Sequence, residues 1–137
     1  MRPFEIIDHT ADVGLAAHGA TREQLFANAA LGMAAIIGDV AKVRETETRD
    51  VHVTASDIAA LLATFLSELL YLLEVEHFVC RRADVESVTE TDVRATAYGE
   101  PISPEHDIHT EIKAVTHHDL TVEQRNDAWH ATVLFDI

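Results

Sequence analysis

The segment DHTADVG, residues 8–14, gathers several oxygen and nitrogen donors near the beginning of the sequence. Asp8, His9 and Asp12 are residue types that can transfer a proton or bind a metal ion. Aspartate is also common in turns, where its side chain accepts a hydrogen bond from a nearby backbone N–H. The segment therefore predicts a polar turn between two strands, and the spacing alone leaves open whether it is also half of a chemical site.

The other concentration of carboxylates lies at the end of the sequence, in WHATVLFDI. Strand alternation places residues 129, 131, 133 and 135 on the core face and Asp136 on the opposite face. We expect the α-carboxylate of Ile137 beside the Asp136 side chain, and two adjacent negative groups repel unless solvent or a cation separates them. One interpretation is a solvated strand end. The other is a set of oxygen ligands suited to Ca²⁺, Mg²⁺ or Mn²⁺ rather than to zinc.

Lys113 is one of only two lysines, and it lies in the segment TEIKAVTHH. The pattern places Ile112 and Ala114 on the core face, so Lys113 should face the other way together with Glu111. The simplest interpretation is an exposed ion pair between Lys113 and Glu111, which contributes little to stability.

The nine histidines do not form a pattern typical of a metal site. His117 and His118 are adjacent, so on a strand they point to opposite faces and cannot bind one ion together. His106 and His109 lie in or beside a loop, with no third ligand close in sequence. We expect these four histidines to be exposed and not to bind metal.

Two helices are predicted in the first half of the chain. Thr21 and Gln24 have the spacing of a capping box, and the helix that follows ends at Gly38. Its core face comprises Leu25, Ala29, Met33, Ile36 and Ile37. Ser56 and Asp57 open a second helix whose apolar residues cover most of its circumference, so a sheet and the first helix should cover it. Thr64, Ser67 and Glu68 interrupt its apolar run, which favours a buried helix over a membrane span.

Strands dominate the rest of the sequence. The predicted strands are residues 3–7, 13–19, 49–54, 78–88, 92–100, 110–118, 120–125 and 129–137. EPISPEHD is predicted as a loop, and RNDA as the hairpin turn between the last two strands. This order predicts an α+β fold: one two-layer domain over residues 1–137, with a mainly antiparallel sheet packed against two helices.

Composition excludes several classes of function. The chain has 137 residues, 24 acidic against 10 basic, and a net charge of −14, so it should repel phosphates rather than bind nucleic acid directly. Cys80 is the only cysteine, which excludes an intramolecular disulfide and a multi-cysteine zinc site and favours the cytoplasm. The N-terminus lacks the apolar region of a signal peptide. Walker A, G-x-S-x-G, H-E-x-x-H and G-x-G-x-x-G patterns do not occur, which argues against the enzymes that they mark.

Six segments together resemble the archease family, and they cover nearly the whole chain. In order they are IIDHTADVGLAAHG, LFANAALGM, FLSELLYLLEVEHF, GEPISPEH, EIKAVTHHDL and VLFDI. The sequence departs from the family pattern at His117, where an aromatic residue is expected, and in its heavier acidity. The resemblance implies a cytosolic α+β protein that is not an enzyme.

The same resemblance implies a function, a cofactor and a set of site residues. Archeases are protein cofactors of the tRNA-splicing RNA ligase of the RtcB type, whose GTP- and Mn²⁺-dependent guanylylation and repeated turnover they promote. The functionally critical residues carried over are Asp12, Lys113 and Asp136, and the metal ligands are Asp12, Asp136 and Ile137. Asp12 begins one strand and Asp136 ends another, so the two can meet if those strand ends lie at the same edge of the sheet.

Two other functions remain as alternatives. An older proposal for the family is a chaperone or modulator of a tRNA cytosine methyltransferase, which needs no metal. A metal-dependent phosphoesterase is disfavoured, because only two aspartates and the terminal residue converge and neither a nucleophile nor a second metal set is evident.

Overall fold

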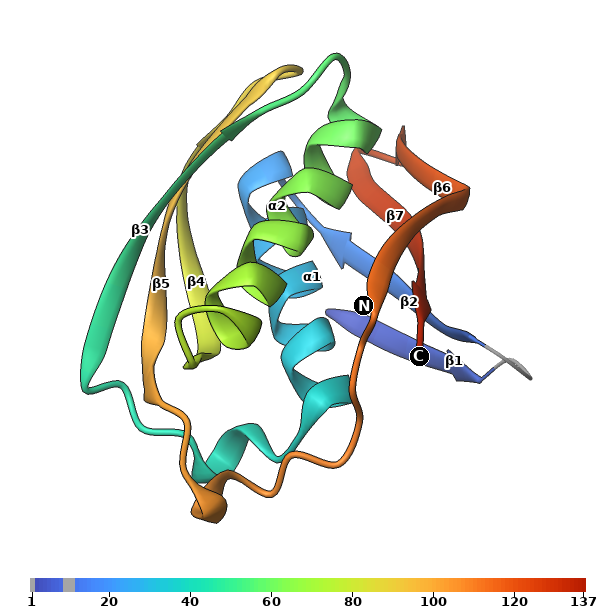
Figure 1. Cartoon of the computed structure of the whole chain (residues 1–137). Coiled ribbons are helices and arrows are strands. Elements are labelled where there is room, and N and C mark those ends of the chain that lie inside the picture. Colours follow the sequence, from blue (N-terminus) through green and yellow to red (C-terminus); the bar gives the residue numbers. More distant parts are fainter. Residues whose placement is uncertain (1, 9–11) are drawn as a thin grey trace.

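The computed structural model describes residues 2–8 and 12–137 of the chain, which form two helices and seven strands (Figure 1). One sheet has the order β1-β2-β7-β6 and comprises β1 (Phe4–Asp8), β2 (Asp12–Gly19), β7 (Ala128–Asp136) and β6 (Ala114–Arg125). The other has the order β3-β5-β4 and comprises β3 (Glu47–Thr54), β5 (Asp92–Pro101) and β4 (Phe78–Val88). The helices are α1 (Arg22–Ile37) and α2 (Ile58–Glu74), and two short 3₁₀ turns are η1 (Val40–Lys42) and η2 (Pro104–His106).

The two helices lie between the two sheets (Figure 1). Helix α1 packs against β2 and β4, and α2 packs against β6, β3 and β4. All strand pairs within the sheets are antiparallel. The predicted α+β class with antiparallel pairing and two helices is confirmed. The division of the strands into two sheets on either side of the helices was not predicted.

Local signals in the sequence explain where α1 begins and how it packs. The Thr21 hydroxyl accepts a hydrogen bond from the Gln24 backbone N–H at 3.1 Å, and the Gln24 side-chain oxygen accepts one from the Ala20 N–H at 2.9 Å. The predicted core face is buried: Leu25, Ala29, Met33, Ile36 and Ile37. Gly32 lets the helix approach β2 closely, because a Cβ at this position would lie 2.5 Å from the Cδ1 of Leu15.

Helix α2 is covered on most of its circumference, as its composition predicts. The Asp57 carboxylate caps the helix by accepting a hydrogen bond from the Ala60 N–H at 2.8 Å. Four of its residues are completely buried: Leu61, Leu62, Phe65 and Leu66. The predicted cover, a sheet together with the first helix, is confirmed by its contacts with β3, β4, β6 and α1. Within residues 2–8 and 12–137, neither helix has the length and apolar character needed to span a membrane.

The last hairpin differs from its prediction in its first strand. The two strands predicted at 110–118 and 120–125 are a single strand, β6, whose pairing with β7 slips between Thr116 and Thr121. The predicted RNDA turn is confirmed: Asn126 and Asp127 have φ angles of 54° and 60°, as a type I′ hairpin requires. The prediction that Ala114 faces the core is wrong. Ala114 is the cross-strand partner of Asp136 and lies on the exposed face, whereas the next residue, Val115, pairs with the buried Phe135.

Candidate functional site

Strand pairing brings the beginning, the end and an internal segment of the chain together at one end of the β1-β2-β7-β6 sheet. Asp12, the first residue of β2, is the cross-strand partner of Asp136, the last residue of β7. On the other side of β7, Asp136 is also the partner of Ala114, the first residue of β6. Figure 1 shows the end of β7 close to the start of β2. The two strand ends therefore lie at the same edge of the sheet, as a shared site of Asp12 and Asp136 requires.

The Asp12 and Asp136 side chains lie on the same face of the sheet. Residues directly opposite each other in antiparallel strands share a face, with Cβ atoms about 5 Å apart. Their neighbours Val13 and Phe135 are buried, at 9% and 0% exposure, so the aspartates face away from the helices. Asp136 is exposed and Asp12 is half-buried. Two carboxylates in this relationship repel each other, and a cation between them would relieve the repulsion.

Lys113 lies at the same edge, immediately before β6. Its backbone N–H donates a 2.7 Å hydrogen bond to the backbone oxygen of Asp136, and its side chain is exposed. Ile112 beside it is 2% exposed, in agreement with its predicted place in the core. The expected ion pair between Lys113 and Glu111 is absent from the ion pairs of the described residues. The ammonium group is therefore not tied to its sequence neighbour.

The donor set at this edge suits a hard cation. Asp12 and Asp136 supply carboxylate oxygens, and Ile137, which is 39% exposed, follows Asp136 with its main-chain oxygens. Oxygen ligands of this kind are preferred by Ca²⁺, Mg²⁺ and Mn²⁺. In the part of the chain that the structure describes, no group of three His, Cys, Asp or Glu side chains could hold a metal ion, so main-chain oxygens and water would have to complete the shell. His9 and Thr10 lie outside the described residues.

The histidines considered in the sequence have different environments. His117 and His118 are exposed, and His118 lies 3.3 Å from the carboxylate of Asp119. His109 is also exposed and lies 2.9 Å from the hydroxyl of Thr110. The prediction that His106 is exposed is wrong, because only 1% of it is accessible.

His106 is buried because a carboxylate and a backbone amide satisfy both of its ring nitrogens. The Ser103 N–H donates to Nδ1 at 3.0 Å, which leaves the ring proton on Nε2, 2.9 Å from the carboxylate of Glu100. The Arg44 N–H donates to the same carboxylate at 2.7 Å. This amide, followed by His106, lowers the pKa of Glu100. The signal in the sequence was the spacing of Ser103 and His106, which resembles a capping box with histidine in the third helical position.

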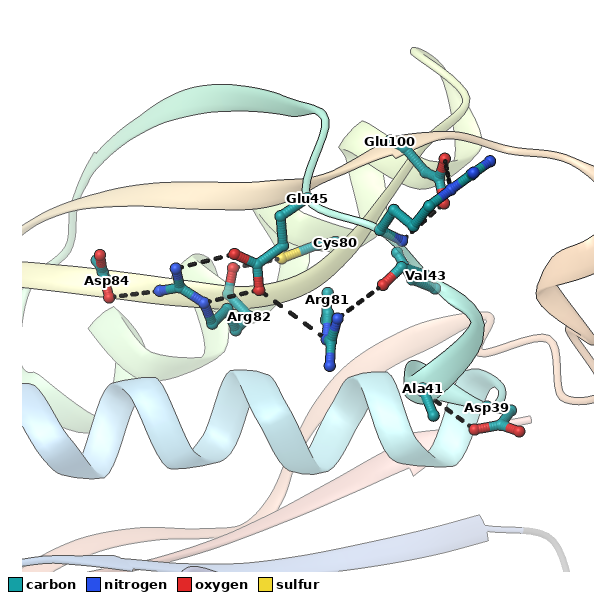
Figure 2. A network of polar contacts seen from close by, with 10 residues as sticks. Asp39, Ala41, Val43, Glu45, Cys80, Arg81, Arg82, Asp84 and Glu100 are labelled. Carbon is teal, nitrogen blue, oxygen red and sulfur yellow. Dashed lines mark hydrogen bonds and ion pairs between the residues drawn. The ribbon is translucent and has the colours of Figure 1, made fainter.

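A second charged cluster lies on β4, where the carboxylates form ion pairs with arginines (Figure 2). The Arg82 guanidinium donates two hydrogen bonds to Glu45, at 2.9 and 3.0 Å, and one to Asp84 at 2.7 Å. The hydrogen bond from Arg82 lowers the pKa of Glu45. Burial raises the pKa of the neighbouring Cys80 thiol to about 12, so the thiol is protonated at neutral pH and unreactive. This cluster joins the 39–45 segment to β4 and offers no free ligand set.

A pair of histidines that the sequence did not indicate lies at the other end of the first sheet. His18 on β2 and His130 on β7 are cross-strand partners, with their Nδ1 atoms 2.8 Å apart. Burial, followed by the proximity of His130, lowers the pKa of His18. One nitrogen donates and the other accepts, so the pair requires at least one neutral ring.

Comparisons with known proteins agree on one family. The model of the Archease protein family (MTH1598/TM1083) matches residues 4–137. The protein archease of Methanosarcina acetivorans is 42% identical over 141 residues, covering 99% of this chain and 97% of the relative. That of Pyrococcus furiosus is 37% identical over 143 residues, covering both chains completely.

Two solved structures share the fold. The solution structure of Methanobacterium thermoautotrophicum protein 1598 superposes with a TM-score of 0.84 at 32% identity, with both chains covered completely. A Thermotoga maritima protein described as an archease and possible chaperone superposes with a TM-score of 0.69 at 21% identity, covering 100% of this chain and 98% of its own.

Proposed function

The chain belongs to the archease family, and from this membership and the geometry of the Asp12–Asp136 edge we propose that it is a cation-binding protein cofactor of an RtcB-type RNA ligase. In this proposal the chain catalyses no reaction itself and promotes the GTP-dependent guanylylation and repeated turnover of the ligase. The observation that carries the proposal is the register of β2 and β7, which makes Asp12 and Asp136 direct partners.

Each residue of the edge has a defined part in the proposal. Asp12, Asp136 and the main-chain oxygens of Ile137 would hold one Ca²⁺, Mg²⁺ or Mn²⁺ ion. A cation held there would supply positive charge for the phosphate groups of the ligase's nucleotide. Lys113, fixed by its backbone hydrogen bond to Asp136, would add a second positive group at the same edge.

The charge of the chain is consistent with such a partner. A net charge of −14 disfavours direct binding of RNA, whereas it favours association with a protein that carries a basic RNA-binding surface. The partner is therefore expected to contact RNA, and this chain to contact the partner.

The test combines a functional and a binding measurement. The purified chain is added to the purified ligase with GTP and Mn²⁺, and guanylylated ligase is followed over many turnovers; calorimetric titration of the chain alone with Ca²⁺ or Mn²⁺ gives its cation affinity. Asp12→Ala and Asp136→Ala should each lose both stimulation and cation binding. Asp50→Ala, at an exposed position on β3 in the other sheet, is the matched control and should lose neither. Full stimulation by Asp12→Ala would refute the proposal.

A second candidate is a chaperone or modulator of a tRNA cytosine methyltransferase. The description of the Thermotoga maritima relative as a possible chaperone and the exposed apolar side chains of this chain favour it. It predicts that the chain prevents aggregation of the methyltransferase, and that Asp12→Ala does so equally well because no cation is needed.

A further inference from the structure

An apolar groove of about 550 Å³ lies between the C-terminal end of α2 and residues 102–113. It is lined by Leu70, Leu73 and Ile112 and by two exposed residues, the wall residues Ile102 and Ile108. The two wall residues are 44% and 38% exposed. The volume lies within the range of binding pockets. Large apolar side chains gathered around a concave surface indicate an interaction site rather than scattered surface residues.

The walls of the groove are held in place by hydrogen bonds. The Ile102 N–H donates to the His77 backbone oxygen at 2.7 Å, and the His109 N–H donates to the Ile37 oxygen at 3.0 Å. Between these two points, the buried pair of Glu100 and His106 fixes η2. The groove is therefore formed before anything binds, which reduces the entropy lost on binding.

The rim of the groove carries two glutamates, together with Lys113 and His77. Glu74 and Glu111 line it, and neither takes part in an ion pair among the residues that the structure describes. The carbonyl end of the α2 dipole adds partial negative charge, and no basic residue in the last turn of α2 opposes it. Lys113 is positive and lies toward β6. An occupant with a basic group beside an apolar side chain would complement this surface.

The groove leads to the Asp12–Asp136 edge through Lys113. This residue lines the groove, and its backbone N–H is bonded to Asp136. An occupant of the groove is consequently held next to the strand end at which the two aspartates pair.

We propose that this groove is the docking site for a segment of the ligase, in which a large aliphatic or aromatic side chain lies next to a lysine or arginine. This inference rests on the proposed function and names the surface through which the partner is recognised. A second copy of this chain is a poorer occupant, because two chains that each carry a net charge of −14 repel each other. Docking in the groove would position the Asp12–Asp136 edge relative to the nucleotide site of the ligase.

The main test replaces an exposed wall residue. Ile102→Ser and Ile108→Ser should each weaken binding to the purified ligase by about tenfold, as expected for an anchor residue. Ile6→Ser is the matched control, because Ile6 on β1 has the same side chain and a similar exposure of 46%. Thermal unfolding should show wild-type midpoints for all three variants. At saturating concentration the groove variants should stimulate the ligase fully, because docking is weakened and the Asp12–Asp136 edge is intact.

A second variant tests the charge of the rim. Glu111→Gln should weaken binding to the ligase and make the affinity less dependent on salt, because one charge pair across the interface is lost. Asp50→Gln, on β3 in the other sheet and not among the residues that line the groove, should change neither quantity.

The possible outcomes distinguish a wrong docking site from a wrong proposed function. If the wild type binds and stimulates the ligase and the groove variants bind equally well, the docking site is wrong and the function stands. If the wild type neither binds nor stimulates, both are overturned. If Ile102→Ser changes only the oligomeric state of the chain, the groove binds a second copy. Loss of stimulation at saturation would show that the groove acts in the reaction step and not in docking, which also contradicts the inference.

Discussion

Asp12 and Asp136 come from the two ends of the sequence and are direct partners on neighbouring antiparallel strands. Their carboxylates share one face of the sheet, and both members of this cross-strand pair are negatively charged. In the proposed function this relationship is a trade-off between stability and binding, because two carboxylates placed to hold a cation repel each other without one.

Asp12→Asn should therefore stabilise the cation-free chain. Removing one of two facing charges is expected to raise the free energy of unfolding by about 0.5 kcal/mol in the presence of a chelator. The wild type should gain stability when Ca²⁺ or Mn²⁺ is added, whereas the variant should not, since only a binding-competent native state is stabilised by a ligand. Thermal unfolding with and without the cation measures both effects. Asp50→Asn is the control, and an equal cation response in all three proteins would contradict the proposed ligands.

The histidine pair predicts a specific dependence of stability on pH. Burial and His130 lower the pKa of His18 in the folded chain below its ordinary value of 6.5. As the pH falls through 6.5, the unfolded chain binds a proton at His18 more readily than the folded chain does. The free energy of unfolding should consequently decrease on acidification.

His18→Gln should reduce this dependence on pH. Chemical denaturation at about pH 7.5 and about pH 5.5 measures the change for each protein, and the variant should lose less stability between the two values. His118→Gln, at an exposed position, should keep the wild-type response. An unchanged response in His18→Gln would show that other groups cause the loss of stability.

His106→Ala should destabilise the chain although the residue lies in a loop region. The substitution removes the hydrogen bond between His106 and the buried Glu100 carboxylate. We expect the free energy of unfolding to fall by about 2 kcal/mol. His109→Ala, three residues away and exposed, should change it by less than about 0.5 kcal/mol. Urea denaturation measures both, and equal effects of the two substitutions would refute a special role for the buried pair.

The elements were predictable because their signals are local. The caps of both helices and the alternation in most strands identified them to within one or two residues, and the turn at Asn126 and Asp127 followed from its residue types. Strand β6 was predicted less well, because its slip in register interrupts the alternation on which the prediction depended. The separation of the strands into two sheets was missed, since periodicity reports which side chains are buried and not which strands pair.

The candidate site was predictable only in part for the same reason. Spacing predicted Asp12 as a turn residue and Asp136 as a residue at a strand end. That the two are cross-strand partners depends on long-range pairing, which spacing does not report. Only the resemblance to a family placed both residues in one site. His106 was missed because its burial depends on Glu100 and Arg44, which reach it from other segments. The pair of His18 and His130 was missed because it too forms across two strands.

The position of β7 constrains the order in which the chain acquires its structure during synthesis. This strand is the last in sequence, yet it lies between β2 and β6 in the first sheet. Until β7 has paired, the hairpin of β1 and β2 has an open edge, with backbone groups free to pair with other chains. Insertion of β7 both closes that edge and brings Asp136 to Asp12, so in the proposed function the binding of a cation would report that the first sheet has formed.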